Sequence, residues 1–375
     1  MTPELLETFF ALLRLSLDTE GVDSVVARLK QRPLTAGDWK KLYKESGKQT
    51  IVGVMLVGIH KLPEDLLPPD EILDDWTSDA FYIHQANDKM NRMCAKVTRM
   101  FMERGLHPII LKGQANATLY PDPYSRQPGD IDIFVEGGKK NVIRHLTQMG
   151  LMKGAETTSH HVELAPKHFD GISVEVHFQP VACMPLGPGR RLLKYLGQTA
   201  DFKNCKLNPA GFYEPPLEFA LAMQLSHIRR HFIGEGVGLR QLVDYFLLLR
   251  NSPAETRVSF SKKLKELGLL SISSAVMYPL KYLLNLGDEE LISAPNEKWG
   301  GKLQNLVLNG GNFGKAVDRE DESLMEFWIH NRKNALNLSK FDFAEAAWYE
   351  INYWKSFLAY TPRRIKQRKL SFRHK

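Results

Sequence analysis

Cysteine is scarce in this chain, whose 375 residues include only Cys94, Cys183 and Cys205. The three lie far apart, and none belongs to a Cys-x-x-Cys pair. An odd, scattered set argues against a disulfide framework and against a metal cluster built from cysteines. It is typical of a protein kept in a reducing compartment, so we expect a cytoplasmic location.

Long apolar segments are also missing, because no uninterrupted apolar run approaches the roughly 20 residues that span a bilayer. We therefore expect no transmembrane segment. The first residues, Met1 to Glu7, lack the basic start of a secretory signal. Charged residues make up 25% and hydrophobic residues 43% of the chain, which excludes a disordered, collagen-like or coiled-coil protein and favours two or three globular domains.

Acidic residues are absent from the last 13 positions, which hold seven Lys or Arg. The rest of the chain has 43 basic and 43 acidic residues, so the net charge of +7 belongs to this tail. A basic tail can contact nucleic acid or an anionic surface. A frayed, solvated terminus is the commoner case.

The hydrophobic pattern divides the chain into an N-terminal helical region, a central part with short strands, a C-terminal helical region and the basic tail, over residues 1–96, 97–210, 211–362 and 363–375. In the first region, apolar residues recur at intervals of three and four. Helices are predicted there over 5–17, 36–43, 52–60 and 79–103, the last ending at Gly105 in a left-handed cap.

The central part alternates between strand and helix patterns. Strands are predicted over 107–111, 130–135, 160–165 and 172–178, with helices over 114–120 and 139–149. This order predicts an α+β fold with a small mixed sheet. The C-terminal region begins with an apolar stripe over 217–232, and residues 239–250 are apolar almost all round, which predicts a buried helix.

Two acidic residues stand two positions apart in the strand Asp130-Ile-Asp132. Side chains two apart on a strand point the same way, which puts these carboxylates side by side. They repel each other unless a cation lies between them, and hard oxygen ligands suit Mg²⁺ or Mn²⁺. The alternative is an acidic, solvated edge strand.

A third carboxylate, Glu175, alternates with valines in a later strand. If that strand lies beside the first, Glu175 completes a cluster able to hold two metal ions for in-line phosphoryl displacement. His177 shares the face of Glu175 and is a candidate substrate contact.

A candidate phosphate site precedes the acids. Gly113 lies where a strand turns into a helix, and a residue without Cβ lets backbone N–H groups approach a phosphate. Lys112 and Arg126 could neutralise phosphate oxygens, Arg126 with a bidentate fork. Either could instead cover surface or pair with a carboxylate.

Together, Leu111-Lys-Gly, Leu119-Tyr-Pro, the run from Arg126 to Val135 and the later Glu175-Val-His resemble the DNA polymerase β-type nucleotidyltransferase superfamily. More narrowly, they resemble the bacterial uncharacterised nucleotidyltransferase family, and this likeness extends into the C-terminal helices. The resemblance implies a nucleotidyltransferase core and transfer of a nucleoside monophosphate from an NTP, with ATP our expected donor, to an acceptor.

The resemblance also assigns roles. It implies that Asp130 and Asp132 bind two Mg²⁺ or Mn²⁺ ions and that Glu175 is the third acid, which activates the acceptor. The superfamily turn usually carries a second small residue after its glycine, and here that position is Gln114. Its side chain could hinder the triphosphate or contact it.

Two pairs in the C-terminal region have weaker claims. His227 and His231 are four apart on a helix, and packing or hydrogen bonding is commoner there than zinc binding, although His227 is a candidate substrate contact. Arg240 and Asp244 are also four apart, where an intrahelical ion pair is the default. Turned toward the cleft, Asp244 could hydrogen-bond a nucleotide or acceptor.

Two other functions fit the same motifs. A module that had lost its chemistry could bind a nucleotide or a protein partner, and a kinase or phosphohydrolase could use the same metal cluster. The acceptor stays open among a protein, a small molecule and RNA. The glycine-rich segment 234–238 follows a helix and not a strand, so we interpret it as a flexible connection.

Overall fold

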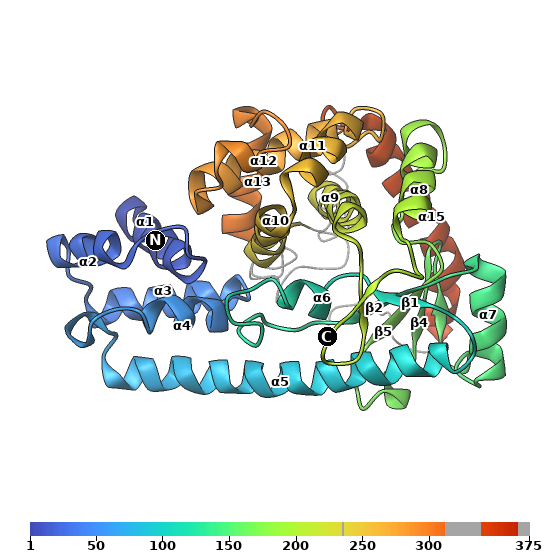
Figure 1. Cartoon of the computed structure of the whole chain (residues 1–375), viewed down its shortest axis with the longest axis horizontal. Coiled ribbons are helices and arrows are strands. Elements are labelled where there is room, and N and C mark those ends of the chain that lie inside the picture. The colour runs from blue at the N-terminus through green and yellow to red at the C-terminus, as the bar shows by residue number, and fades with distance from the viewer. Residues whose placement is uncertain (235, 312–338, 367–375) are drawn as a thin grey trace.

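The computed structural model describes residues 1–234, 236–311 and 339–366, with side chains through residue 355. The N-terminal region is helical, as predicted, and comprises α1 (Pro3–Ser16), α2 (Val22–Gln31), α3 (Ala36–Lys48), α4 (Val52–Ile59), the 3-10 helix η1 (Glu64–Leu66) and α5 (Asp70–Met102). Figure 1 shows α5 as a long base that lies under α3 and α4 at one end and under the sheet at the other.

Helix α5 begins at Asp70, earlier than the sequence pattern predicts. Ile72 and Trp76 are 3% and 0% exposed and extend the apolar stripe at a spacing of four. The Trp76 indole also donates a hydrogen bond of 2.9 Å to the carbonyl of Val52, which fixes α5 against α4. The helix ends as expected, with Gly105 at a φ of +70°.

The central region forms a five-stranded sheet in the order β1-β2-β5-β4-β3. Its strands are β1 (Pro108–Ile110), β2 (Ile131–Val135), β3 (Glu156–Thr157), β4 (His161–Leu164) and β5 (Val174–His177). Strands β2 and β5 are parallel, and the other neighbours are antiparallel. The mixed sheet agrees with the predicted α+β class, although the two-residue β3 was too short for the pattern to reveal.

The two faces of the sheet differ in chemistry. Ile131, Ile133 and Val135 of β2 join Val174 and Val176 of β5 in a core with α5 and with α7 (Gly138–Gln148). The alternate residues point to the opposite face, toward the C-terminal helices. On that face Phe134 stacks on Phe219, with ring centroids 6.1 Å apart. The polar residues of β2 and β5 therefore face the helical half of the protein.

The C-terminal half is helical, as predicted, with a short hairpin. Its elements are α8 (Gly187–Thr199), β6 (Lys206–Leu207), β7 (Tyr213–Glu214), α9 (Leu217–Ile233), α10 (Leu239–Asn251), α11 (Ala254–Lys263), α12 (Leu270–Leu284), η3 (Asp288–Glu290), α13 (Glu297–Gly310) and α15 (Phe343–Lys366), and a 3-10 turn η2 (Pro166–His168) precedes β5. The predicted buried helix is α10. Of the basic tail, residues 367–375 lie outside the described residues.

The helices at the two ends of the chain share one hydrophobic core. The guanidinium of Arg14 donates to the carbonyl of Leu283 at 3.2 Å, and the amide of Gln49 donates to the carbonyl of Val307 at 3.0 Å. The N- and C-terminal helical regions therefore support each other and hold the sheet between α5 and the α9–α10 pair (Figure 1).

Candidate functional site

Strands β2 and β5 place two of the predicted acids directly opposite each other. Asp132 is the register partner of Glu175 across the parallel pair. Neighbouring partners on parallel strands point to the same face, so both carboxylates project toward the helical half. The side chain of Asp132 is 2% exposed and that of Glu175 is 23% exposed. The structure therefore brings Asp132 and Glu175 together, as the sequence analysis expected.

Asp130 lies on the same side, just before β2, and its side chain is 41% exposed. The ammonium of Lys112 lies 3.9 Å from a carboxylate oxygen of Asp130 and 3.1 Å from Oδ2 of Asp132. Repulsion from Asp132, together with burial, raises the pKa of Asp130. The pair thus behaves as two adjacent acids with one cation beside them.

His177 contacts both acids of the register pair. Its Nε2 lies 3.1 Å from Oδ1 of Asp132 and 3.4 Å from Oε2 of Glu175. Burial alone would lower the pKa of His177, but hydrogen bonds to these two carboxylates raise it to about 9. For Asp132, burial by itself would raise the pKa. The charge of Lys112 and the hydrogen bond and charge of His177 outweigh burial and hold the pKa of Asp132 well below its usual range.

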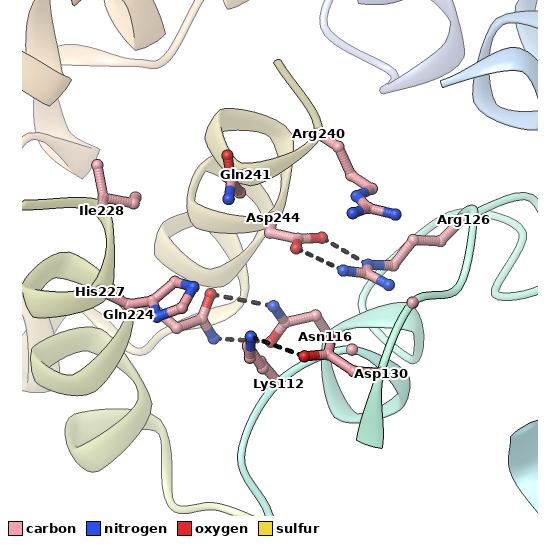
Figure 2. A pocket seen from close by; sticks show the side chains of 12 residues that line it. Lys112, Asn116, Arg126, Asp130, Gln224, His227, Ile228, Arg240, Gln241 and Asp244 are labelled. Carbon is pink, nitrogen blue, oxygen red and sulfur yellow. Dashed lines mark hydrogen bonds and ion pairs between the residues drawn. The ribbon is translucent and has the colours of Figure 1, made fainter. Parts of the chain in front are cut away.

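One pocket opens beside these acids, between the sheet and helices α9 and α10. Figure 2 shows Lys112, Asn116 and Asp130 on one side and Gln224 and His227 on the other. Asn116 and Gln224 exchange amide hydrogen bonds of 3.0 and 2.7 Å, which joins α6 (Gln114–Ala117) to α9.

Gly113 also lines this pocket, at the turn from β1 into α6. It has a φ of +63°, which glycine adopts readily and other residues rarely do. The backbone conformation of this turn therefore requires the glycine that the sequence analysis singled out.

Arg126 and Asp244 form a buried bidentate ion pair at the rim of the pocket (Figure 2). Both N–O distances are 2.8 Å, and each side chain is 7% exposed. The hydroxyl of Tyr120 donates to the same carboxylate at 2.7 Å. Burial raises the pKa of Asp244, but Arg126 and the hydrogen bonds outweigh it and lower that pKa.

The predicted intrahelical pair of Arg240 with Asp244 is therefore wrong, because Asp244 is satisfied by Arg126 from a different segment. Arg240 instead donates to the carbonyl of Gln127 at 2.7 Å, and no ion pair of Arg240 occurs within the described residues. Burial, followed by the charge of Arg126, lowers the pKa of Arg240 to about 10.

The chain was also compared with known protein families. The model of the uncharacterised nucleotidyltransferase family matches residues 35–285, which is more than half of the chain. The chain belongs to this family. The nucleotidyltransferase match runs from the start of α3 to the end of α12 and includes the acids, Gly113 and the pocket. No curated protein matches the chain.

Gln114 is directed away from the pocket. Its amide donates to the side chains of Asn87 at 3.2 Å and Asn91 at 2.7 Å, both on α5. The side chain is thus engaged in the interface between α6 and α5. Neither the hindrance nor the triphosphate contact expected of this side chain is supported by its position.

His227 does line the pocket, as a half-buried imidazole. Burial, and then the nearby charge of Lys112, lowers its pKa well below the usual value. Its ring lies on that of His231, with centroids 4.3 Å apart. Within the described residues, the groups of side chains spaced to hold a metal include His177 but not His227.

Sequence reasoning missed three features of this region. Arg240 was assigned to an ion pair, and Asn116, Gln224 and His161 were given no functional role. His161 is the register partner of His177 and lies 3.4 Å from Glu175. The only available signal was the alternation of His161 and Glu163 with apolar residues.

No described helix is long and apolar enough to cross a membrane.

Proposed function

We propose that this nucleotidyltransferase transfers a nucleoside monophosphate from an NTP to an acceptor and releases pyrophosphate. An acceptor oxygen attacks the α-phosphorus, the bond from that phosphorus to the bridging oxygen of the β-phosphate breaks, and pyrophosphate leaves with the electron pair. The pairing of Asp132 with Glu175 beside a pocket rich in cationic side chains is the observation that carries this proposal.

Several features of the carboxylates fit divalent cations. Oδ2 of Asp132 is buried and, within the described residues, makes no hydrogen bond of good geometry despite the nearby Lys112. One oxygen each of Asp132 and Glu175 and one nitrogen of His177 lie within 4.8 Å of one another. We propose that Asp130, Asp132 and Glu175 hold Mg²⁺ or Mn²⁺, which would neutralise the phosphate charge that develops during transfer.

The positions of the other charged residues suggest a role for each. Lys112 and Arg240 would neutralise phosphate oxygens, because both ammonium and guanidinium face the pocket. Arg240 suits this role better than Arg126, whose guanidinium is already held by Asp244. Glu175 is the most exposed acid of the register pair and would orient the acceptor and receive its proton.

We also propose the finer assignments that the sequence motifs suggest. These are membership of the DNA polymerase β-type superfamily, ATP as the donor and a cytoplasmic location. Asp130 and Glu175 are partly exposed, so an acceptor can reach them from solvent. The acceptor could be a protein, a small molecule or an RNA end.

A second candidate function is a binding module without catalysis. The specific observation in its favour is that Lys112 and His177 already lie against Asp132. Two cations of the chain itself can therefore balance the acids. Such a module would bind a nucleotide without turning it over.

Two measurements separate these functions. Thermal unfolding with ATP and Mg²⁺ or Mn²⁺ reports binding, because a ligand that prefers the folded state raises the Tm. Product analysis with α-labelled ATP then identifies the chemistry. Pyrophosphate release supports nucleotidyl transfer, ADP or orthophosphate indicates another phosphoryl enzyme, and stabilisation without turnover indicates the binding module.

A further inference from the structure

Three imidazoles gather beside Glu175. His160 lies just before β4, His161 begins β4, and His177 ends β5, where it also contacts Asp132. Register pairing places His161 beside His177, and the rings of His160 and His177 have centroids 5.4 Å apart. We call His160, His161 and His177 the imidazole cluster.

Two of these rings lie beside one carboxylate oxygen, and the third ring lies beside the other two. Nδ1 of His161 lies 3.1 Å from Nε2 of His160 and 3.4 Å from Oε2 of Glu175. Nε2 of His177 lies 3.4 Å from the same oxygen. One ring nitrogen from each histidine lies within 4.8 Å of the other two.

These separations are close to those of a tetrahedral zinc site. With Zn–N and Zn–O distances of 2.0–2.2 Å, neighbouring ligand atoms in a tetrahedron are about 3.3–3.5 Å apart. The distances from His161 and His177 to Glu175 match this spacing, and the distance between His160 and His161 is 0.2 Å shorter. Burial supports the same reading, because His161 and His177 are 8% and 5% exposed.

The cluster differs in chemistry from the acids beside it. Carboxylates suit Mg²⁺ and Mn²⁺, whereas imidazoles suit Zn²⁺ and other late transition metals.

We propose that His160, His161 and His177, with Glu175 as a fourth ligand, form a Zn²⁺ site adjacent to the proposed Mg²⁺ site. The inference does not depend on nucleotidyl transfer. The Zn²⁺ site would nevertheless affect nucleotidyl transfer, because Zn²⁺ at this position would hold Glu175 and His177 away from Asp132. Zn²⁺ would then inhibit Mg²⁺-dependent turnover.

The test is metal binding by the full chain after chelator treatment. Zn²⁺ affinity is measured by calorimetry, and Co²⁺ is used as a spectroscopic substitute whose visible absorption reports tetrahedral nitrogen ligation. His160→Asn removes a half-buried ligand, and His84→Asn removes an exposed imidazole from α5 as the matched control. Asp130→Asn tests whether Zn²⁺ binding requires the Asp130 carboxylate, and Tm without metal confirms that each variant is folded.

We expect one Zn²⁺ per chain, retained in a large excess of Mg²⁺. His160→Asn should weaken binding by at least about 100-fold, beyond the 10–100-fold effect of outer-shell changes. His84→Asn and Asp130→Asn should leave it unchanged. Absence of Zn²⁺ binding, or equal affinity in folded His160→Asn, would overturn the proposal. Loss of turnover in Asp130→Asn with Zn²⁺ binding intact would show that Zn²⁺ binding does not require a working catalytic site.

Discussion

The ion pair between Arg126 and Asp244 offers a test of how the pocket is held together. Arg126→Met removes the guanidinium but leaves Asp244 fully buried, with the Tyr120 hydroxyl as its remaining partner. Breaking a buried pair in this way costs about 3–5 kcal/mol. We therefore expect the free energy of unfolding at pH 7 to fall by that amount.

A second substitution separates the charge from the packing. In Arg126→Met with Asp244→Asn, the buried charge is gone and an amide oxygen still accepts from Tyr120. We expect this double variant to regain at least about 2 kcal/mol relative to the single one, because uncompensated charge is the larger part of the penalty. Urea unfolding followed by tryptophan fluorescence measures both values.

The pH dependence should change sign between the two proteins. In the wild type the pKa of Asp244 is lowered, so its stabilising contribution is present above the unfolded value of about 3.9 and is lost as the pH falls. In Arg126→Met, burial without the charge of the guanidinium raises that pKa. The destabilisation should therefore shrink between pH 7 and pH 5. A loss below about 1 kcal/mol at pH 7, or a loss independent of pH, would refute the structural role of this pair.

Replacing Arg240 by Gln should raise KM for the NTP by at least about tenfold, since a hydrogen bond to a charged group is worth about 1.5–3 kcal/mol. Arg240→Lys keeps the charge, so its KM should rise less. An unchanged KM in Arg240→Gln would show that Arg240 does not bind phosphate. Gln114→Ala should lower unfolding free energy by about 1 kcal/mol without changing NTP affinity, as measured by urea unfolding and calorimetry. Removing residues 367–375 should leave turnover of small substrates unchanged, and a steep, salt-dependent loss of acceptor binding would instead identify nucleic acid.

Local patterns were sufficient to predict the central strands. Residues 130–133 alternate between acids and isoleucines, and β2 has the two faces that this alternation implies. The positions of β1, β4 and β5 follow from similar short runs. Their predicted ends extend one or two residues beyond the observed strands, because the neighbouring residues share the strand composition. Helices α2 and α8 were missed, since only two or three apolar positions in each are buried.

The approach of Glu175 to Asp132 could be proposed but not established from sequence. It depends on β5 lying next to β2 in parallel, a long-range pairing that the alternation of neither strand specifies. The same limit applies to Arg126. Its guanidinium is 118 positions from Asp244 in the chain, so the nearer Arg240 was the natural but incorrect partner. Charge partners on different elements are decided by packing and not by spacing along one helix.

The central claim is that the acids from β2 and β5 hold a divalent cation together with the NTP. Mn²⁺ binding is the most direct test, measured by electron paramagnetic resonance in the presence of a non-hydrolysable ATP analogue. Glu163→Gln is the matched control, because Glu163 is the exposed register neighbour of Glu175 on β4.

We predict that Asp132→Asn and Glu175→Gln each weaken nucleotide-dependent Mn²⁺ binding by at least about 100-fold, more than an outer-shell change does. Glu163→Gln should bind Mn²⁺ as the wild type does. Equal Mn²⁺ affinity in folded Asp132→Asn, Glu175→Gln and wild-type protein would contradict the account.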